Sequence, residues 1–285
     1  MNLHQLLADA PALLPWALGL LALVLLAAAL EGVVMTRWLR RAYDWRAFWA
    51  SLAVTLGRRV FDAAGVSLAA PLFAWAYTHR LQTIELNTAL AVLLLFAGQE
   101  FCYYWFHRAS HRVRWLWATH AVHHSPNELT LAASLRLGWT GKITGATVFY
   151  VPLVWLGFAP GAVVATLALN LLYQFWLHAT WIPKLGVLER VLNTPSHHRV
   201  HHGSNAEYLD CNYGGVLIVF DRLFGTFVEE REDLPVRYGL TQPLHTYNPL
   251  RIAFFEWLQL ARDVRKARGL AHLLRTLFGP PGARA

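Results

Sequence analysis

Five long apolar stretches restrict the kinds of fold that this sequence can adopt. The first is an almost unbroken run of Leu, Ala, Val and Gly, close to the ~20 residues that a helix needs to cross a bilayer. Hydrophobic residues make up 56% of the 285-residue chain and charged residues only 15%, which is too apolar for an ordinary soluble domain. We therefore predict an all-α, integral membrane helical bundle with about five spans. The predicted spans are Leu13–Leu30, Val60–Tyr77, Leu86–Phe106, Ile143–Phe158 and Gly161–Trp176.

The distribution of basic residues predicts how these spans are oriented. Residues 1–12 contain no Lys or Arg, so we expect the first stretch to be a retained span and not a signal peptide. Six arginines follow it before the second span, whereas the link between spans two and three holds only Arg80. Most other basic residues follow span three or span five, which predicts a multi-pass protein with a cytoplasmic C-terminus. The net charge of +8 then reflects topology and attraction to anionic lipid, and we expect no nucleic-acid partner.

The chain is expected to form a single domain over residues 1–285, with a core at about 86–245. Residues 250–278 alternate apolar and basic side chains at helical spacing, which predicts an amphipathic C-terminal helix. Two cysteines, Cys102 and Cys211, cannot form an iron–sulfur or four-thiolate zinc site, and we expect both to be structural.

Histidines carry the clearest sign of chemistry. Nine of the fourteen fall in three short clusters, within 107–111, 120–124 and 197–202, and His178 closes the fifth predicted span. Residues at i, i+3 and i+4 of a helix share one face, so each cluster can present two or three imidazoles to one metal ion. Two clusters read His-x-x-His-His, a repetition that structural histidines do not explain.

The predicted topology brings every histidine cluster to one side of the membrane. Spans four and five form a hairpin that returns the chain to the face where span three ended, so we expect one cytoplasmic-face site. Eight or nine imidazoles are too many for one ion and suffice for two ions with four or five ligands each. Whether His197 is a further ligand stays open. The predicted ligands are His107, His111, His120, His123, His124, His178, His198, His201 and His202.

The identity of the metal is inferred from the chemistry that a membrane substrate demands. The zinc-protease motif His-Glu-x-x-His is absent from the sequence, so hydrolysis lacks an obvious general base. Iron can activate O2 to attack an unactivated C–H bond, whereas zinc has no accessible redox change. We expect a di-iron oxygenase, with a membrane zinc hydrolase or a non-catalytic metal-binding protein as the alternative.

Several motifs resemble those of the fatty acid hydroxylase and sterol desaturase superfamily and, within it, those of the alkylglycerol monooxygenases. The segments that carry the resemblance are Tyr104–Arg108, Asn170–His178, Asn193–Gly203, Asn212–Ile218, Asp221–Phe227 and Tyr238–Thr241. The resemblance implies hydroxylation of the ether-linked carbon of an alkylglycerol. O2 would supply the oxygen atom, and tetrahydrobiopterin would be the electron donor. A sterol or fatty-acyl desaturase or hydroxylase with the same site is the alternative. The lipid substrate would enter from the bilayer.

Four polar residues are candidates for supporting the ligands. We expect Glu100 to hydrogen-bond a ligand imidazole such as His107, or else to pair with Arg108 or Arg112. Gln174 lies on the same helix face as His178 and is either a supporting residue or a packing amide. Asp210 and Asn212 are expected to brace the third cluster. After the second cluster this chain has Leu129 and Thr130 where the family pattern has a tyrosine and an asparagine, and Leu137 and Gly138 also replace polar residues.

Overall fold

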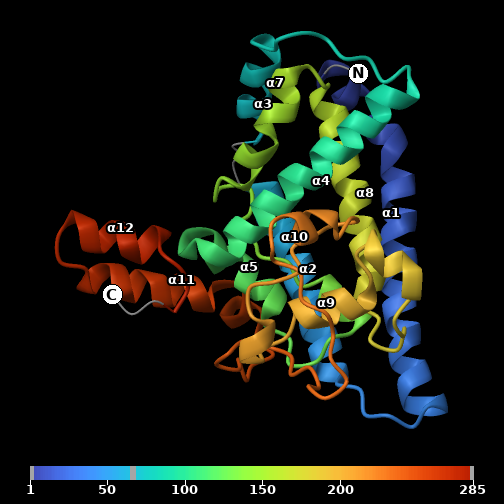
Figure 1. Ribbon diagram of the computed structural model, residues 1–285, viewed down its shortest axis with the longest axis vertical. Coiled ribbons are helices and arrows are strands. Elements are labelled where there is room, and N and C mark those ends of the chain that lie inside the picture. The colour runs from blue at the N-terminus through green and yellow to red at the C-terminus, as the bar shows by residue number, and fades with distance from the viewer. Residues whose placement is uncertain (1–2, 65–68, 283–285) are drawn as a thin grey trace.

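The computed structural model describes residues 3–64 and 69–282, and within those ranges its regular elements are helices (Figure 1). Strand-like pairing in these ranges is limited to three isolated bridges, so the all-α prediction is confirmed. The principal helices are α1 (Leu3–Val33), α2 (Trp45–Ala64), α3 (Ala69–Thr78), α4 (Ala89–Arg112), α5 (Arg114–His124), α6 (Leu131–Ser134), α7 (Val151–Leu156), α8 (Pro160–Leu177), α9 (Pro195–His201), α10 (Val219–Leu223), α11 (Pro249–Lys266) and α12 (Leu270–Phe278).

Three long apolar segments form the body of the protein. Leu18–Trp38, Ala89–Arg112 and Pro160–Leu177 are long and apolar enough to cross a membrane, and they coincide with the first, third and fifth predicted spans. Thr88 begins α4 by accepting a hydrogen bond from the Ala91 amide, and Pro160 occupies the first turn of α8. Most of the exposed large side chains on these helices are apolar, as expected for contact with lipid.

The other two predicted spans do not appear as single long helices. Val60–Tyr77 is divided between the end of α2 and α3, and residues 65–68 lie outside the described residues. Ile143–Phe158 contains a turn, a 3-10 helix at Ala146–Tyr150 and the short α7, with Gly145 and Gly157 in backbone conformations that favour glycine. These pieces pack with α4 and α8 around Phe73, Leu95 and Leu153. The number of spans and the cytoplasmic orientation stay predictions.

The ends of α4 and α8 that carry histidines lie at the same end of the bundle. An extended residue, Val113, separates α4 from α5 and allows α5 to turn back beside it. A long connection after α8 leads to α9, where Pro195 occupies the first turn. Figure 1 shows α5, α9 and α10 gathered around this end of α4 and α8.

The predicted amphipathic helix over 250–278 is two helices. α11 ends at Lys266, and Gly269, with a φ of 77°, permits the reversal into α12. The continuous-helix prediction is therefore wrong, because the apolar and basic spacing continues across the break. Arg114 at the start of α5 holds the hairpin through Glu256 and Asp263 on α11, at 3.4 and 2.6 Å. Figure 1 shows the hairpin projecting from the side of the bundle.

Gly57 on α2 provides a test of the packing between α2 and the segment after α6. The Trp139 side chain covers this glycine, and its indole donates to the Val54 carbonyl at 2.9 Å. A Cβ at position 57 would overlap the Trp139 ring. We predict that Gly57→Ala destabilises the protein by ~1–3 kcal/mol, the usual cost of overpacking. Thermal unfolding in detergent would measure the change.

Gly19 on α1 is the matched control, because a Cβ there would meet no atom within 4 Å. Gly19→Ala should leave the unfolding midpoint unchanged or raise it slightly, since alanine favours helix. Equal midpoints for Gly57→Ala and Gly19→Ala would contradict the packing described for Trp139.

Candidate metal centre

The structure brings all nine predicted ligands together in two adjacent groups. Within each group, one ring nitrogen per residue lies within 4.8 Å of the corresponding atoms of the others. The rings of His124 and His202, one from each group, stack with centroids 4.4 Å apart, so the groups lie side by side. The first group is His107, His111, His120, His124 and His201, and the second is His123, His178, His198 and His202.

The two His-x-x-His-His clusters each contribute to both groups. In each cluster the residues at i and i+4 join one group and the residue at i+3 joins the other: His123 is separated from its cluster neighbours, and so is His201. A helix advances about 100° per residue, so positions i+3 and i+4 lie on opposite sides of position i, about 100° apart. Each cluster therefore places two imidazoles in one group, as the spacing allowed, and its third imidazole in the other group.

Several ring nitrogens within a group face each other at short distance. His107 Nε2 lies 3.0 Å from His120 Nε2, and His198 Nε2 lies 3.3 Å from His178 Nε2. The lone pairs of such facing nitrogens converge on one region, an arrangement that a bound cation stabilises. His111 Nε2 and His201 Nε2 are buried and have no hydrogen-bond partner in the described residues, which also fits metal ligation.

Backbone carbonyls orient three of the imidazoles. Nδ1 of His107 donates to the Tyr213 carbonyl, Nδ1 of His201 to the Cys211 carbonyl, and Nδ1 of His178 to the Gln174 carbonyl, at 2.8–2.9 Å. A proton on Nδ1 leaves the Nε2 lone pair free for a metal. The importance of Tyr213 and Cys211 could not be found in the sequence, because the groups involved are main-chain oxygens.

Burial keeps these imidazoles neutral. It lowers the pKa of His123 to about 4 and of His178 to about 3. Burial, together with neighbouring histidines, lowers the pKa of His120, His124, His198, His201 and His202 well below 6.5. Neutral imidazole is the form that binds a metal, so the donors are prepared for ligation at neutral pH.

Glu100 supports the site through the loop at 212–217. Its carboxylate accepts hydrogen bonds from the Val216 and Leu217 amides, each at 2.8 Å, and from Asn170. Neither expected contact is present: Glu100 bonds neither His107 nor the two arginines, since Arg108 donates to Tyr104 and Arg112 pairs with Asp210. The carboxylate lies within α4 and reaches the loop whose Tyr213 carbonyl orients His107.

Asp221 braces the same loop from its other side. Its two carboxylate oxygens accept from the Tyr213 and Gly214 amides at 2.8 and 2.7 Å. Two acidic side chains therefore fix the loop by satisfying four backbone amides. The sequence could not identify this loop as the partner of Asp221, because the groups that it accepts from are main-chain amides.

A line of polar residues on α8 connects Glu100 to His178. Gln174 donates to Asn170 at 2.6 Å and accepts from the Tyr103 hydroxyl at 2.9 Å. Asn170 in turn donates to Glu100, so Gln174 lies within a continuous hydrogen-bond network. Asn170 was missed in the sequence, although its i, i+4, i+8 spacing with Gln174 and His178 in an apolar helix was the available signal.

Asp210, Asn212 and His197 lie around the ligands. Asp210 pairs with Arg112 at 2.8 Å and lies 3.7 Å from His111 Nδ1. Asn212 bonds the His197 carbonyl and both backbone groups of Val228, so it fixes the loop after α9. The His197 ring contacts Phe227 and approaches Glu189, outside both histidine groups. Metal ligation by the nine histidines stays a prediction, and this geometry gives His197 no part in it.

The chain is similar to known monooxygenases and hydroxylases over most of its length. Residues 92–226, which contain all nine histidines, match the fatty acid hydroxylase family. The alkylglycerol monooxygenases of Xenopus tropicalis and Homo sapiens are each 39% identical to it, over 81% and 76% of this chain and 51% and 48% of those proteins. The chain thus spans about half the length of these curated relatives. The ornithine lipid hydroxylase OlsE of Rhizobium tropici is 30% identical over 64% of this chain and 54% of that protein. No solved structure is significantly similar.

Replacing single ligands tests the site. His123→Ala or His201→Ala should each lower the metal content of the purified protein, measured by inductively coupled plasma mass spectrometry. His272→Ala is the control, because His272 accepts from the Arg268 amide on the distant C-terminal hairpin. The same metal content in all three variants would show that the histidine groups do not bind the metal.

Acid should destabilise the metal-free protein. The folded histidines have lowered pKa values, so the unfolded chain binds more protons below pH 6.5. Their contribution to stability is complete above pH 6.5 and is lost as the pH falls towards 4. Each histidine accounts for at most ~1.4 kcal/mol per pH unit. Thermal unfolding of chelator-treated protein should show a midpoint lower at pH 5.5 than at pH 7.5, and an unchanged midpoint would contradict the neutral imidazoles.

Proposed function

We propose that the chain is a membrane di-iron monooxygenase that hydroxylates a lipid, because residues 92–226 match the fatty acid hydroxylase family and the chain is 39% identical to alkylglycerol monooxygenases. The observation that carries this proposal is the pair of adjacent, buried, neutral histidine groups at one end of the apolar helices. Five and four imidazoles match the ligand numbers of two ions.

The reaction assigned to the site is hydroxylation of the ether-linked carbon of an alkylglycerol. One oxygen atom of O2 enters the C–H bond, and the other leaves as water with two electrons and two protons from a donor. The resulting hemiacetal breaks its C–O bond to glycerol and releases an aldehyde. We assign tetrahydrobiopterin as the electron donor on the basis of family resemblance.

Residues of the chain prepare the site in three ways. The two histidine groups would hold two iron ions, which supply the redox change that O2 activation requires. Carbonyls of Tyr213, Cys211 and Gln174 keep protons on Nδ1, so that each Nε2 faces inward. The surrounding buried side chains keep bulk water from the reaction. In the proposed orientation the site and the C-terminus face the cytoplasm, and the lipid enters from the bilayer.

Two other functions are compatible with part of this geometry. A sterol or fatty-acyl desaturase would use the same ligands, but it would remove two hydrogen atoms from the substrate and add no oxygen atom to it. A membrane zinc hydrolase or a non-catalytic metal-binding protein would consume no O2. The homology to monooxygenases favours the oxygenase over both.

Oxygen labelling tests the proposed function. The purified protein, loaded with iron and supplied with tetrahydrobiopterin and a 1-O-alkylglycerol, should convert ¹⁸O2 into an aldehyde that contains one ¹⁸O atom. The aldehyde is reduced to an alcohol at once, to prevent exchange with water, and is analysed by mass spectrometry. A product with a new double bond and no label would indicate a desaturase, and no O2 consumption with iron present would exclude both redox reactions.

A further inference from the structure

A small cavity with both polar and apolar walls lies at the end of α1, beside the segments that follow α5 and α8. Its volume is about 230 Å³. This is far more than the ~10–15 Å³ that one water needs, and less than the ~300–1,000 Å³ of a pocket for a whole small-molecule ligand. It therefore accommodates part of a ligand. The polar side chains that line it include Glu31, Tyr43, Glu128, Thr130, Thr180 and Tyr238.

Wall residues of the cavity follow closely after histidines of the site along the chain or pair with the segment that carries them. Thr180 follows His178 by two residues, and Thr130 lies on the short connection that follows α5 and its histidines. Tyr238 forms a backbone bridge with Gly203, the residue after His202. Two segments therefore carry both a histidine of the site and a wall of the cavity, and a third wall segment pairs with the chain directly after His202.

The cavity is held open by fixed contacts. Glu31 accepts from the Leu131 amide at 2.7 Å and from the Trp181 indole at 3.1 Å, so α1 is joined to two of the wall segments. Gly32 leaves the space in which the Tyr43 ring packs, because a Cβ there would lie 2.8 Å from that ring. The buried Tyr43 hydroxyl makes no hydrogen bond of normal geometry within the described residues, although Thr130 lies beside it. A buried hydroxyl without a partner gains from a hydrogen bond, and this hydroxyl belongs to a residue that lines the cavity.

The charges of the wall favour an uncharged, hydroxyl-bearing ligand. Glu31 and Glu128 contribute two carboxyl groups and Arg41 one guanidinium, so the wall offers no excess of positive charge to a phosphate. Hydroxyl groups, by contrast, can donate to the carboxylates and bond the tyrosine and threonine side chains.

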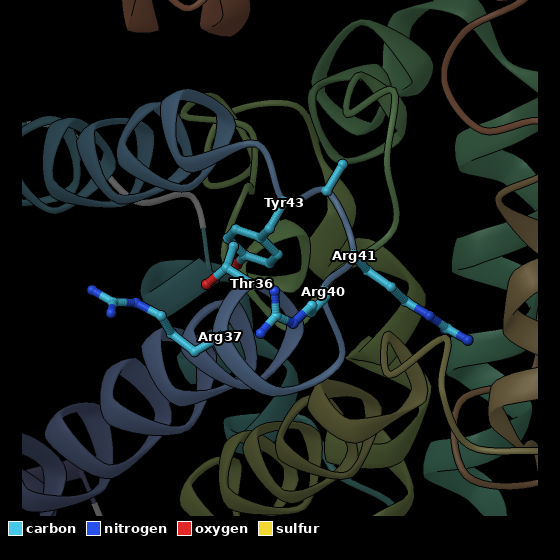
Figure 2. A pocket seen from close by; sticks show the side chains of 6 residues that line it. Thr36, Arg37, Arg40, Arg41 and Tyr43 are labelled. Carbon is cyan, nitrogen blue, oxygen red and sulfur yellow. The ribbon is translucent and has the colours of Figure 1, made fainter.

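A neighbouring basic hollow does not change this assignment. It is lined by Thr36, Arg37, Arg40, Arg41, Ala42 and Tyr43 and shares the last three with the cavity. Figure 2 shows that the side chains of Arg37 and Arg41 extend in opposite directions from the chain, so they do not converge on one anion.

We infer that this cavity binds the glycerol head group of the substrate and thereby places the ether-linked carbon at the metal centre. The inference rests on the proposed function. Only the ether oxygen separates the reacting carbon from the glycerol, so a head-group site must adjoin the metals. The cavity meets this requirement through Thr130, Thr180 and Tyr238.

The test compares two lipids that differ only in the head group. 1-O-dodecylglycerol and dodecyl methyl ether have the same chain and ether oxygen, and only the first carries hydroxyls. Tyr43→Phe and Thr130→Val each remove one hydroxyl from the wall. Each should raise KM for dodecylglycerol about 3- to 10-fold, the usual effect of one hydrogen bond, and leave kcat within about twofold. KM for dodecyl methyl ether should not change.

Thr166→Val is the matched control, since the Thr166 hydroxyl bonds the Ala162 carbonyl of its own helix, α8, and does not line the cavity. It should leave both KM values unchanged. Unchanged KM for dodecylglycerol in Tyr43→Phe and Thr130→Val, with normal turnover, would overturn the head-group site and leave the proposed function intact. An equal rise in KM for both lipids would also overturn it, because a general disturbance of the site would produce such a result.

Binding separates failure of this inference from failure of the proposed function. Dodecylglycerol should raise the unfolding midpoint of the iron-loaded protein more than dodecyl methyl ether does. This difference should shrink in Thr130→Val but not in Thr166→Val. Selective binding without turnover would contradict the proposed function alone, whereas no preference for dodecylglycerol would contradict the head-group site. Stronger stabilisation by 1-O-dodecylglycerol 3-phosphate than by dodecylglycerol would also overturn the assignment of an uncharged head group.

Discussion

Withdrawal of so many imidazoles from water is the constraint on which the rest of this structure depends. A buried histidine must stay neutral, and its N–H must find an acceptor. The acceptors here include main-chain carbonyls of Cys211 and Tyr213, so the chain after α9 must return across the end of α4. The irregular segment between α9 and α10 thus serves in large part to supply oxygen atoms to histidines.

That returning segment needs support, and the support comes from inside the apolar bundle. Glu100 is almost completely buried on α4 and accepts two amides of the loop, while Asp221 accepts two more. Gly215 lies against Asn170 so closely that a Cβ there would collide with its side chain. An acidic residue in an apolar helix is costly unless its oxygens are satisfied, and here the loop satisfies them. The buried carboxylate therefore requires the loop amides, and the loop requires the carboxylate to hold its position.

The sequence predicted the chemistry better than the architecture. Histidine spacing identified the residues that the structure gathers into two groups, because repeated imidazoles on one helix face are typical of metal ligands. It did not reveal which residues share a group, since that depends on how α4, α5, α8 and α9 are rotated about their axes. Hydropathy located α1, α4 and α8 but could not distinguish a spanning helix from the short, glycine-interrupted pieces at 143–158, because both are equally apolar. Glu100 was singled out with the wrong partners, because the two loop amides that it accepts from lie more than a hundred residues away in the chain.

Each of the two His-x-x-His-His clusters supplies histidines to both groups, and this has a consequence for assembly of the site. α5 supplies His120 and His124 to one group and His123 to the other, and the α9 segment divides His198 and His202 from His201 in the same way. Neither group can form without both helices, and a rotation of either helix would withdraw ligands from both. The two groups are therefore coupled through shared helices: an ion bound to one group would also order donors of the other, and its loss would loosen both.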